Sequence, residues 1–508
     1  MATLRLKFYI CSKNMGLIQK DAFKTTLLSY IGIGVGYLNR GVLFLICFST
    51  EQIGLLNLVI SVGLFFAQGA NLGAVFTVLK FLPFFKNTEK KHHGFFPLML
   101  LVVLSGITLF TGLYVLFKPQ IQDLYVDKSP LFLSYYYWVL PIGVSYVLFL
   151  FLEAFLRSLF KNIIAVFAFE ICLRVSITAL LLLSFFKVIS FPTFVALHSL
   201  FYAVPTLILI GYMYVIKELN LSIQSIQLSS RFKKIVLHFS TFNYFNSLGA
   251  VLVNALDVIM IAQMIGLKAT GVYSTVVFLT SALQVPYKSL LRISTPLISD
   301  YWKHRQFDKM KELYQKVSSV TLLIGIVTFL PIWMNIDFLL SFLKPEFQEG
   351  KWVFLFLMIG RLMDMYFGLN GAIFSTSKKY KFDLLFTILL IGTVYGLNLV
   401  LIPIWGISGA AISTAFALII YNVGRVVFVW RIYKMHPFTI NQFKMIGLAI
   451  LTLILGDLLK TVVTHSITTV FIQCILILLL FVLPIIRFNL ESESVAFLKK
   501  LKNRLKKN

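Results

Sequence analysis

Long apolar segments alternate with short polar connections along almost the whole chain. Each segment is close to or longer than the roughly 20 residues that an α-helix needs to cross a hydrocarbon layer of about 30 Å. The segments run approximately over 24–47, 52–79, 94–117, 131–156, 162–186, 190–216, 235–264, 270–300, 317–343, 352–377, 382–404, 408–430, 441–460 and 466–486. The pattern predicts an all-α integral membrane protein with about 14 transmembrane helices.

Positive charge falls on alternate sides of these segments. Of the 46 lysines and arginines, 33 lie at the termini or in even-numbered connections, seven lie in odd-numbered connections, and six lie inside the segments. Short cytoplasmic loops keep positive charge, so the termini and the even-numbered connections are predicted to be cytoplasmic. We call the opposite side the outward side. The net charge of +26 is then spread along a membrane surface, and it does not predict a nucleic-acid partner.

Composition supports the same class. Hydrophobic residues make up 59% of the chain and charged residues 13%, which is too apolar for a soluble protein of 508 residues. The four cysteines are scattered and predict neither a disulfide framework nor a metal site. Residues Met1 to Lys24 have no cleavable apolar core, so no signal peptide is predicted.

The segments group into two lobes of six helices followed by two more helices. The predicted parts are a cytoplasmic segment 1–23, an N-lobe 24–217, a linker 218–234, a C-lobe 235–434, helices 13 and 14 in 435–487, and a basic tail 488–508. The lobes are interpreted as repeats offset by 217 residues, because Gly54 then maps to Gly271 and Lys161 to Lys378. Chance similarity between apolar sequences is the alternative. Transporters built from such repeats bind substrate between the lobes and rock them to alternate access.

Charged and amide side chains inside the segments are the candidate functional residues, because such groups tend to face a cavity or a partner. The candidates for substrate binding are Arg40, Lys288, Arg361, Asn39, Asn71, Asn254, Gln284 and Arg292. Asp257 and Asp364 are candidates for charge pairing or for coupling to H+ or Na+. Under the repeat, Arg40 maps to Asp257 and Asn71 to Lys288. Basic groups exceed acidic ones, which favours an anionic ligand such as a phosphate.

Simpler interpretations stay open for several of these residues. Arg361 and Asp364 are three residues apart and can neutralise each other, as can Glu170 and Arg174. A second set is predicted to be structural: Arg292 and Arg425 as snorkelling side chains, His198 as a packing residue, and Gly32 and Gly36 as a site of close helix packing. No HExxH, Walker A, GxSxG or DxD pattern is present, so an enzyme is not predicted.

Four stretches resemble a known family. They are Thr50 to Val59 (TEQIGLLNLV), Leu256 to Ser274 (LDVIMIAQMIGLKATGVYS), Thr295 to Tyr314 (TPLISDYWKHRQFDKMKELY) and Gly406 to Phe416 (GISGAAISTAF). They resemble O-antigen-type polysaccharide flippases of the multidrug/oligosaccharidyl-lipid/polysaccharide exporter superfamily, over roughly residues 22–433. Lipid II flippases are also similar, but they tend to carry arginines on helices 1, 2 and 8, where this chain has Asn71 on helix 2 and Lys288 on helix 8.

The resemblance implies a function that the residues alone do not give. A flippase of this kind moves undecaprenyl-diphosphate-linked oligosaccharide across a bacterial inner membrane, for lipopolysaccharide or another surface polysaccharide. Its partners would be the lipid-linked oligosaccharide, the bilayer and other polysaccharide assembly proteins, with no cofactor. The alternatives are a multidrug antiporter of the same superfamily, which would prefer an acidic cavity, and a membrane enzyme such as a polymerase or ligase.

The predicted topology can be checked with alkaline phosphatase fusions. Fusions after Lys268 or Lys460 are expected to be active, because these residues lie in outward connections, and fusions after Lys234 or Lys381 inactive. Activity after Lys381 would contradict the arrangement of 14 spans.

Overall fold

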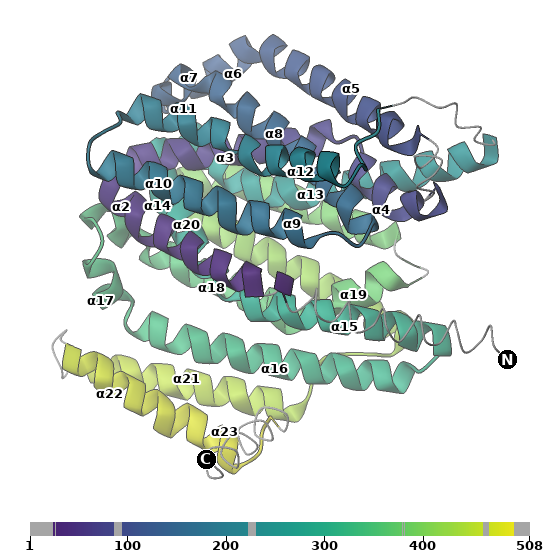
Figure 1. The fold of residues 1–508 in the computed structure, drawn as a ribbon. Helices are drawn as coiled ribbons and strands as arrows, with labels where there is room; N and C mark the ends of the chain where they lie inside the picture. The colour runs from purple at the N-terminus through teal and green to yellow at the C-terminus, as the bar shows by residue number, and fades with distance from the viewer. Residues whose placement is uncertain are drawn as a thin grey trace, which may run out of the picture. The chain divides into compact units, whose positions relative to one another are not determined.

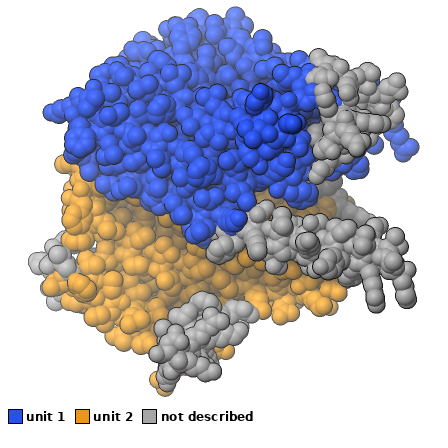
Figure 2. Space-filling view, in the orientation of Figure 1, with its two compact units in different colours: residues 1–271 blue, residues 272–508 orange. Residues whose placement is uncertain are grey.

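The computed structural model describes residues 24–25, 27–85, 94–221, 230–377, 379, 381–460 and 467–491. Regular secondary structure in these residues is helical throughout (Figure 1). By contact the chain divides into two compact units, Met1–Gly271 and Val272–Asn508, coloured separately in Figure 2. The predicted segment 1–23, residues 222–229 of the predicted linker and residues 492–508 of the predicted tail lie outside the described residues. The all-helical membrane fold is confirmed.

Unit 1 contains the first seven predicted spans. They correspond to Leu27–Cys47 with the π-helical turn η1 (Asn39–Leu43) and α2 (Phe44–Cys47), α3 (Thr50–Ala70) with α4 (Ala74–Phe85), α5 (Phe95–Leu116), α8 (Val139–Ser158), α9 (Ile163–Phe167) with η4 (Ala168–Cys172) and α10 (Leu173–Phe185), α11 (Phe191–Phe201) with α12 (Ala203–Val215), and α13 (Ser230–Met264). Two short helices, α6 (Lys118–Tyr125) and α7 (Pro130–Ser134), precede α8. Because α13 packs on α3 and α4, it groups with unit 1.

α14 (Leu267–Ser281) crosses the boundary, and unit 2 contains the other helices. These are α15 (Gln284–His304), α16 (Phe307–Met334), α17 (Ile336–Ser341), α18 (Gly350–Phe367), α19 (Leu369–Thr376), α20 (Lys381–Tyr433), α21 (Ile440–Lys460), α22 (Ile467–Ile477), η6 (Leu478–Val482) and α23 (Leu483–Arg487). α16, α21 and α22 pack side by side (Figure 1).

Eleven described helices are long and apolar enough to span a membrane, or up to 12 with one bent pair, compared with about 14 predicted. Part of the difference comes from interruptions in two predicted spans, and the rest from two spans that are counted together in α20. The predicted span 270–300 is divided between α14 and α15, and the span 352–377 bends by 49° between α18 and α19.

Two predicted spans, 382–404 and 408–430, are joined in α20 across a sharp reversal. Gly406 has φ 58° and ψ −137°, which is not helical. A Cβ on Gly409 would lie 2.0 Å from the carbonyl oxygen of Leu401, whereas eight residues of straight helix rise about 12 Å. The two halves of α20 are therefore antiparallel, as the two separate spans require.

Glycines bring two helix ends, both on the predicted outward side, into backbone contact inside unit 1. A Cβ on Gly54, in α3, would lie 1.9 Å from the carbonyl oxygen of Leu267, and a Cβ on Gly271, in α14, would lie 2.0 Å from that of Thr50. Under the 217-residue offset, Gly54 corresponds to Gly271 and Thr50 to Leu267, so the contact is reciprocal. A local twofold relation of this kind is what two repeats in the same orientation predict.

Alanine at either glycine is expected to separate these helix ends. The added methyl would meet backbone, which cannot move aside as a flexible side chain can, so we expect Gly54→Ala or Gly271→Ala to lose about 1–3 kcal/mol of stability. The measurement is thermal unfolding of the purified protein in detergent. Gly112→Ala is the matched control, since nothing lies within 4 Å of its added Cβ. Equal stability of all three variants would disprove the tight contact.

Candidate functional site

A polar cluster in unit 2 surrounds the break in the tenth predicted span. α18 ends at Phe367, α19 begins at Leu369, and Asp364 and Asn370 flank the break. The hydroxyl of Tyr287 lies only 2.1 Å from where a Cβ of Gly368 would be, so this position requires glycine. Interrupted helices are tolerated in a membrane where they are buried in protein or line a cavity, and transporters use them to bind substrates and ions.

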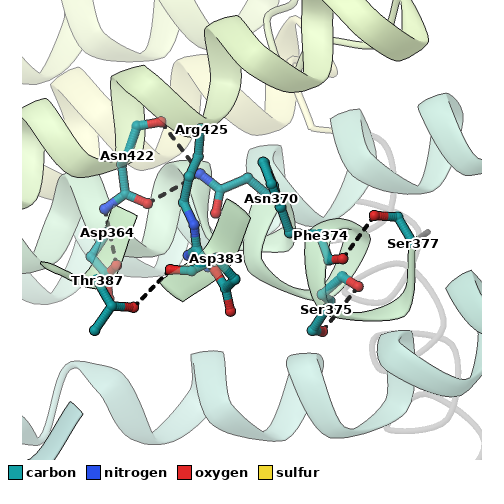
Figure 3. Close-up of polar contacts among 10 residues, drawn as sticks. Asp364, Asn370, Phe374, Ser375, Ser377, Asp383, Thr387, Asn422 and Arg425 are labelled. Atoms are coloured by element: carbon teal, nitrogen blue, oxygen red, sulfur yellow. Dashed lines mark hydrogen bonds and ion pairs between the residues drawn. The ribbon is translucent and has the colours of Figure 1, made fainter. Parts of the chain in front are cut away.

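Asn422, in the second half of α20, connects the two sides of this break. Its Nδ2 donates a hydrogen bond to Oδ1 of Asp364 over 3.1 Å, and its Oδ1 accepts one from Nδ2 of Asn370, also over 3.1 Å. Figure 3 shows this connection between the helices. The three side chains hold α18, α19 and α20 together through buried polar groups, which are costly when unsatisfied.

Arg425, one turn beyond Asn422, forms an ion pair with Asp383 at the start of α20. The reversal at Gly406 makes this contact between residues 42 positions apart. The guanidinium also lies over the ring of Tyr421, with 4.4 Å from Cζ to the centroid. Only 7% of Arg425 is exposed, so the expectation that it snorkels to the membrane surface is wrong. The carboxylate of Asp383 offsets part of the free-energy cost of burying this guanidinium.

Further basic groups act on Asp364. Burial opposes the negative charge of Asp364, whereas the hydrogen bond from Asn422 and the charges of Arg425, Arg361 and Lys288 favour it. The structure thus brings together three residues predicted as candidates, Lys288, Arg361 and Asp364. Counted with Arg425 and Asp383, the cluster holds three basic and two acidic groups, so one positive charge is in excess. Lys288 is exposed and Arg361 partly so, which leaves them better placed than Arg425 to meet a ligand.

A second polar cluster lies in unit 1, between the first span and the fifth. Arg174 pairs with Glu170 at 2.5 Å, which confirms the predicted neutralised pair. Added Cβ atoms on Gly32 and Gly36 would lie 2.5 Å from atoms of residues 170 and 174, which confirms the predicted close packing. Both helices contain a π-helical turn here, η1 and η4, and such turns often occur at functional sites.

Arg40 lies near this cluster and acts electrostatically on Arg174, His198 and Tyr202. His198 is buried and stacks on Phe194 with ring centroids 5.6 Å apart, as expected of a packing residue. Asp257, like His198, is buried. Its pairing with Arg40 stays a prediction.

Two amides predicted as candidates for substrate binding, Asn39 and Asn71, make hydrogen bonds within unit 1. Asn39 donates to the carbonyl oxygen of Arg174 over 2.9 Å and accepts from the hydroxyl of Thr178 over 2.8 Å. Asn71, which is fully buried, donates to Gln68 O over 3.0 Å and accepts from the backbone N–H of Gly73 over 2.7 Å. This turn interrupts the second span between α3 and α4. These bonds use one donor and one acceptor position of each amide, which leaves one of each, so substrate binding by both residues stays a prediction.

The remaining candidates are placed as follows. Asn254 is exposed on α13, and its Nδ2 donates a hydrogen bond to Ala250 O. Gln284 is partly buried at the start of α15, and Arg292 is exposed further along α15.

Sequence reasoning did not single out Asp383 and Asn422. Asp383 comes two residues after Lys381, at a predicted cytoplasmic helix end where a carboxylate is ordinarily hydrated. Among the described residues, no three His, Cys, Asp or Glu side chains group as metal ligands would.

Comparison with known proteins supports the fold. Residues 244–404 match the family model MatE. A structure described as lipid II flippase MurJ in an inward closed conformation superposes with a TM-score of 0.68 at 15% identity, covering 90% of this chain and 97% of MurJ. The fold is that of MurJ.

MATE transporters share this fold over a smaller part of the chain. An inward-facing multidrug resistance MATE transporter of the MOP superfamily gives a TM-score of 0.63 at 13% identity and covers 79% of this chain and 94% of its own. The MATE multidrug transporter DinF-BH gives 0.53 at 15% identity, covering 82% and 95%. No protein with a curated description matches by sequence.

We expect the Arg425–Asp383 pair to be needed for a stable fold and Lys288 not to be needed for it. We expect Arg425→Ala to lower protein abundance sharply, because a stranded buried carboxylate costs about 3–5 kcal/mol. Lys288→Ala, at an exposed position, should leave abundance unchanged. Membrane-fraction immunoblots measure both.

The double variant Arg425→Met, Asp383→Leu removes both charges and should recover most of the abundance. Normal abundance of Arg425→Ala alone would show that the pair does not support the fold.

Proposed function

We propose that this protein is a flippase that moves undecaprenyl-diphosphate-linked oligosaccharide across a bacterial inner membrane by alternating access, with both termini cytoplasmic. The observation that carries the proposal is the excess of positive charge around the broken tenth span. Lys288 and Arg361 are the groups that we assign to the diphosphate. Arginine and lysine bind phosphate by charge-assisted hydrogen bonds, which strengthen where water is excluded.

Arg40 is a further basic residue that we assign to binding of the anionic head. We assign Asn39, Asn71, Asn254 and Gln284 to the sugars, and Arg292 is a further candidate. Arg425 is a positioning residue in this account, because its charge is already used by Asp383. Asp257 and Asp364 are the carboxylates that we assign to coupling by H+ or Na+. The outward glycine contact would have to open when substrate is released, since alternating access separates one end of the lobes at a time.

A multidrug antiporter is the second candidate, because MATE transporters share the fold. Cationic drugs favour an acidic cavity, but Glu170 and Asp383 each form an ion pair with an arginine and Asp364 has basic neighbours. This arrangement favours an anionic substrate over a cationic one.

The extent of the structural match also favours the flippase. Ninety per cent of 508 residues is about 457, more than the 433 residues that end at Tyr433, so the MurJ alignment must extend into the region of α21–α23. The inward-facing MATE transporter covers 79% of this chain, about 401 residues, and a match of that length does not have to include α21–α23. At least 24 of the 75 residues after Tyr433, from 457 − 433 and 508 − 433, therefore align with the lipid II flippase MurJ.

Export of surface polysaccharide tests the assignment of the basic groups. Lys288→Gln, Arg361→Gln and Arg40→Gln should each reduce export about 10-fold or more at normal protein abundance, because a hydrogen bond to a charged group contributes about 1.5–3 kcal/mol. Lipid-linked repeat units should accumulate inside the cell. Lys303→Gln, an exposed change on α15 outside the cluster, is the control. Unchanged polymer with raised sensitivity to cationic drugs in a gene deletion would instead support the antiporter.

A further inference from the structure

An apolar pocket of about 380 Å³ opens on unit 2 near the predicted cytoplasmic membrane surface. Three valines of α20, Val423, Val426 and Val427, form one wall. Trp430, Phe367, His436 and Phe438 complete the lining. None of the residues that line the pocket belongs to the proposed substrate-binding set. Its volume is within the range of small-molecule sites.

Hydrogen bonds hold this pocket in shape. The segment that follows α20 carries His436 and Phe438, and the buried Gln442 fixes it. The Gln442 side chain accepts from the backbone N–H of Thr439 over 2.8 Å and donates to the carbonyl oxygen of Pro437 over 3.0 Å. It also donates to Ser319 Oγ on α16 over 2.7 Å. The ring of Phe438 packs against Phe367 and Tyr366. The pocket is therefore built by specific contacts.

The chemistry around the pocket is apolar inside and basic at its edge. The segment that closes it reads Arg-Ile-Tyr-Lys-Met-His over residues 431–436, and Arg431 and Lys434 are exposed. Tryptophan at position 430 is typical of the membrane–water interface. The Nδ1 atom of His436 is buried and has no hydrogen-bond partner among the described residues, in contrast to the fully bonded amide of Gln442. A buried polar nitrogen without a partner costs free energy unless a ligand satisfies it.

We infer that this pocket is a binding site for an anionic phospholipid of the cytoplasmic leaflet. One acyl chain would occupy the space between the α20 valines and Phe438. The headgroup phosphate would lie at the edge, where Arg431 and Lys434 attract it and His436 Nδ1 donates a hydrogen bond to it or to an ester oxygen. Each basic residue near an anionic leaflet contributes about 1 kcal/mol of attraction, so both together predict a clear preference for anionic over zwitterionic lipid. The site would couple lipid composition to the packing of α20 against α18, next to the polar cluster.

Native mass spectrometry of the full-length protein, with equal amounts of phosphatidylglycerol and phosphatidylcholine, tests this inference. The wild-type protein should retain one phosphatidylglycerol in preference, by about 10-fold or more for two basic groups. Val427→Trp should reduce that retention at least five-fold, because the larger ring fills the pocket from a position that is 38% exposed. Val400→Trp, on the other half of α20 and 57% exposed, is the matched control and should bind as the wild type does.

A second set of variants separates the headgroup from the chain and does not depend on a bulky side chain. Arg431→Gln with Lys434→Gln, and His436→Phe, should remove the preference for phosphatidylglycerol while phosphatidylcholine binding stays unchanged. Lys381→Gln, an exposed basic residue at the other end of α20, should keep the preference. Phosphatidylglycerol with brominated chains should quench the fluorescence of Trp430 in the wild-type protein. The quenched part of the fluorescence should be missing in Trp430→Phe.

Equal retention of both lipids by the wild type, or retention that Val427→Trp does not change, would overturn the inference. Displacement of bound phosphatidylglycerol by a polyprenyl phosphate at equal concentration would also overturn it, and would assign the pocket to the tail of the proposed substrate. Loss of polymer export in the variants of Lys288 and Arg361, with lipid retention intact, would show that the two sites are independent.

Discussion

A charge inside a membrane-spanning unit has to be satisfied by protein, because no water is available there to do so. The Arg425–Asp383 pair meets this requirement in unit 2, and the Arg174–Glu170 pair meets it in unit 1. The first of these pairs depends on the reversal at Gly406, which folds α20 back so that residues far apart in sequence meet. Because Arg425 neutralises Asp383, the positive charge of Lys288 and Arg361 exceeds what Asp364 balances.

Glycine allows the helices to approach closely enough for these contacts. Gly368 leaves space for the hydroxyl of Tyr287 at the bend, and Gly32 and Gly36 leave space for the Glu170–Arg174 pair. At helix ends on the predicted outward side, Gly54 and Gly271 permit backbone contact between α3 and α14. In a membrane, where lipid tails are as apolar as the side chains, such close packing replaces much of the hydrophobic driving force.

The class and the helices could be predicted from sequence because each depends on local composition. Apolar length predicted the spans, and the offset of 217 residues made Gly54 correspond to Gly271, but their contact was not predicted. The convergence of Lys288, Arg361 and Asp364 was anticipated only as a set of candidates. Asn422 and Asp383 could not be found, because their partners come from the bend at Gly368 and the reversal at Gly406.

The error at Arg425 has a physical origin. Arg425 looks like a snorkelling side chain until the carboxylate of Asp383 is placed beside it. The hydrogen bonds of Asn39 to the fifth span are tertiary in the same way. Hydropathy does not report such contacts.

The most direct test of the proposed function is transport by the purified protein in proteoliposomes. Undecaprenyl-diphosphate-linked oligosaccharide is placed in the inner leaflet, and its appearance in the outer leaflet is followed with an impermeant glycosidase. We expect the protein to make the inner-leaflet sugar accessible, and Lys288→Gln to slow this, while a cationic dye is not moved. Transport of the dye without any exposure of the lipid-linked sugar would contradict the account.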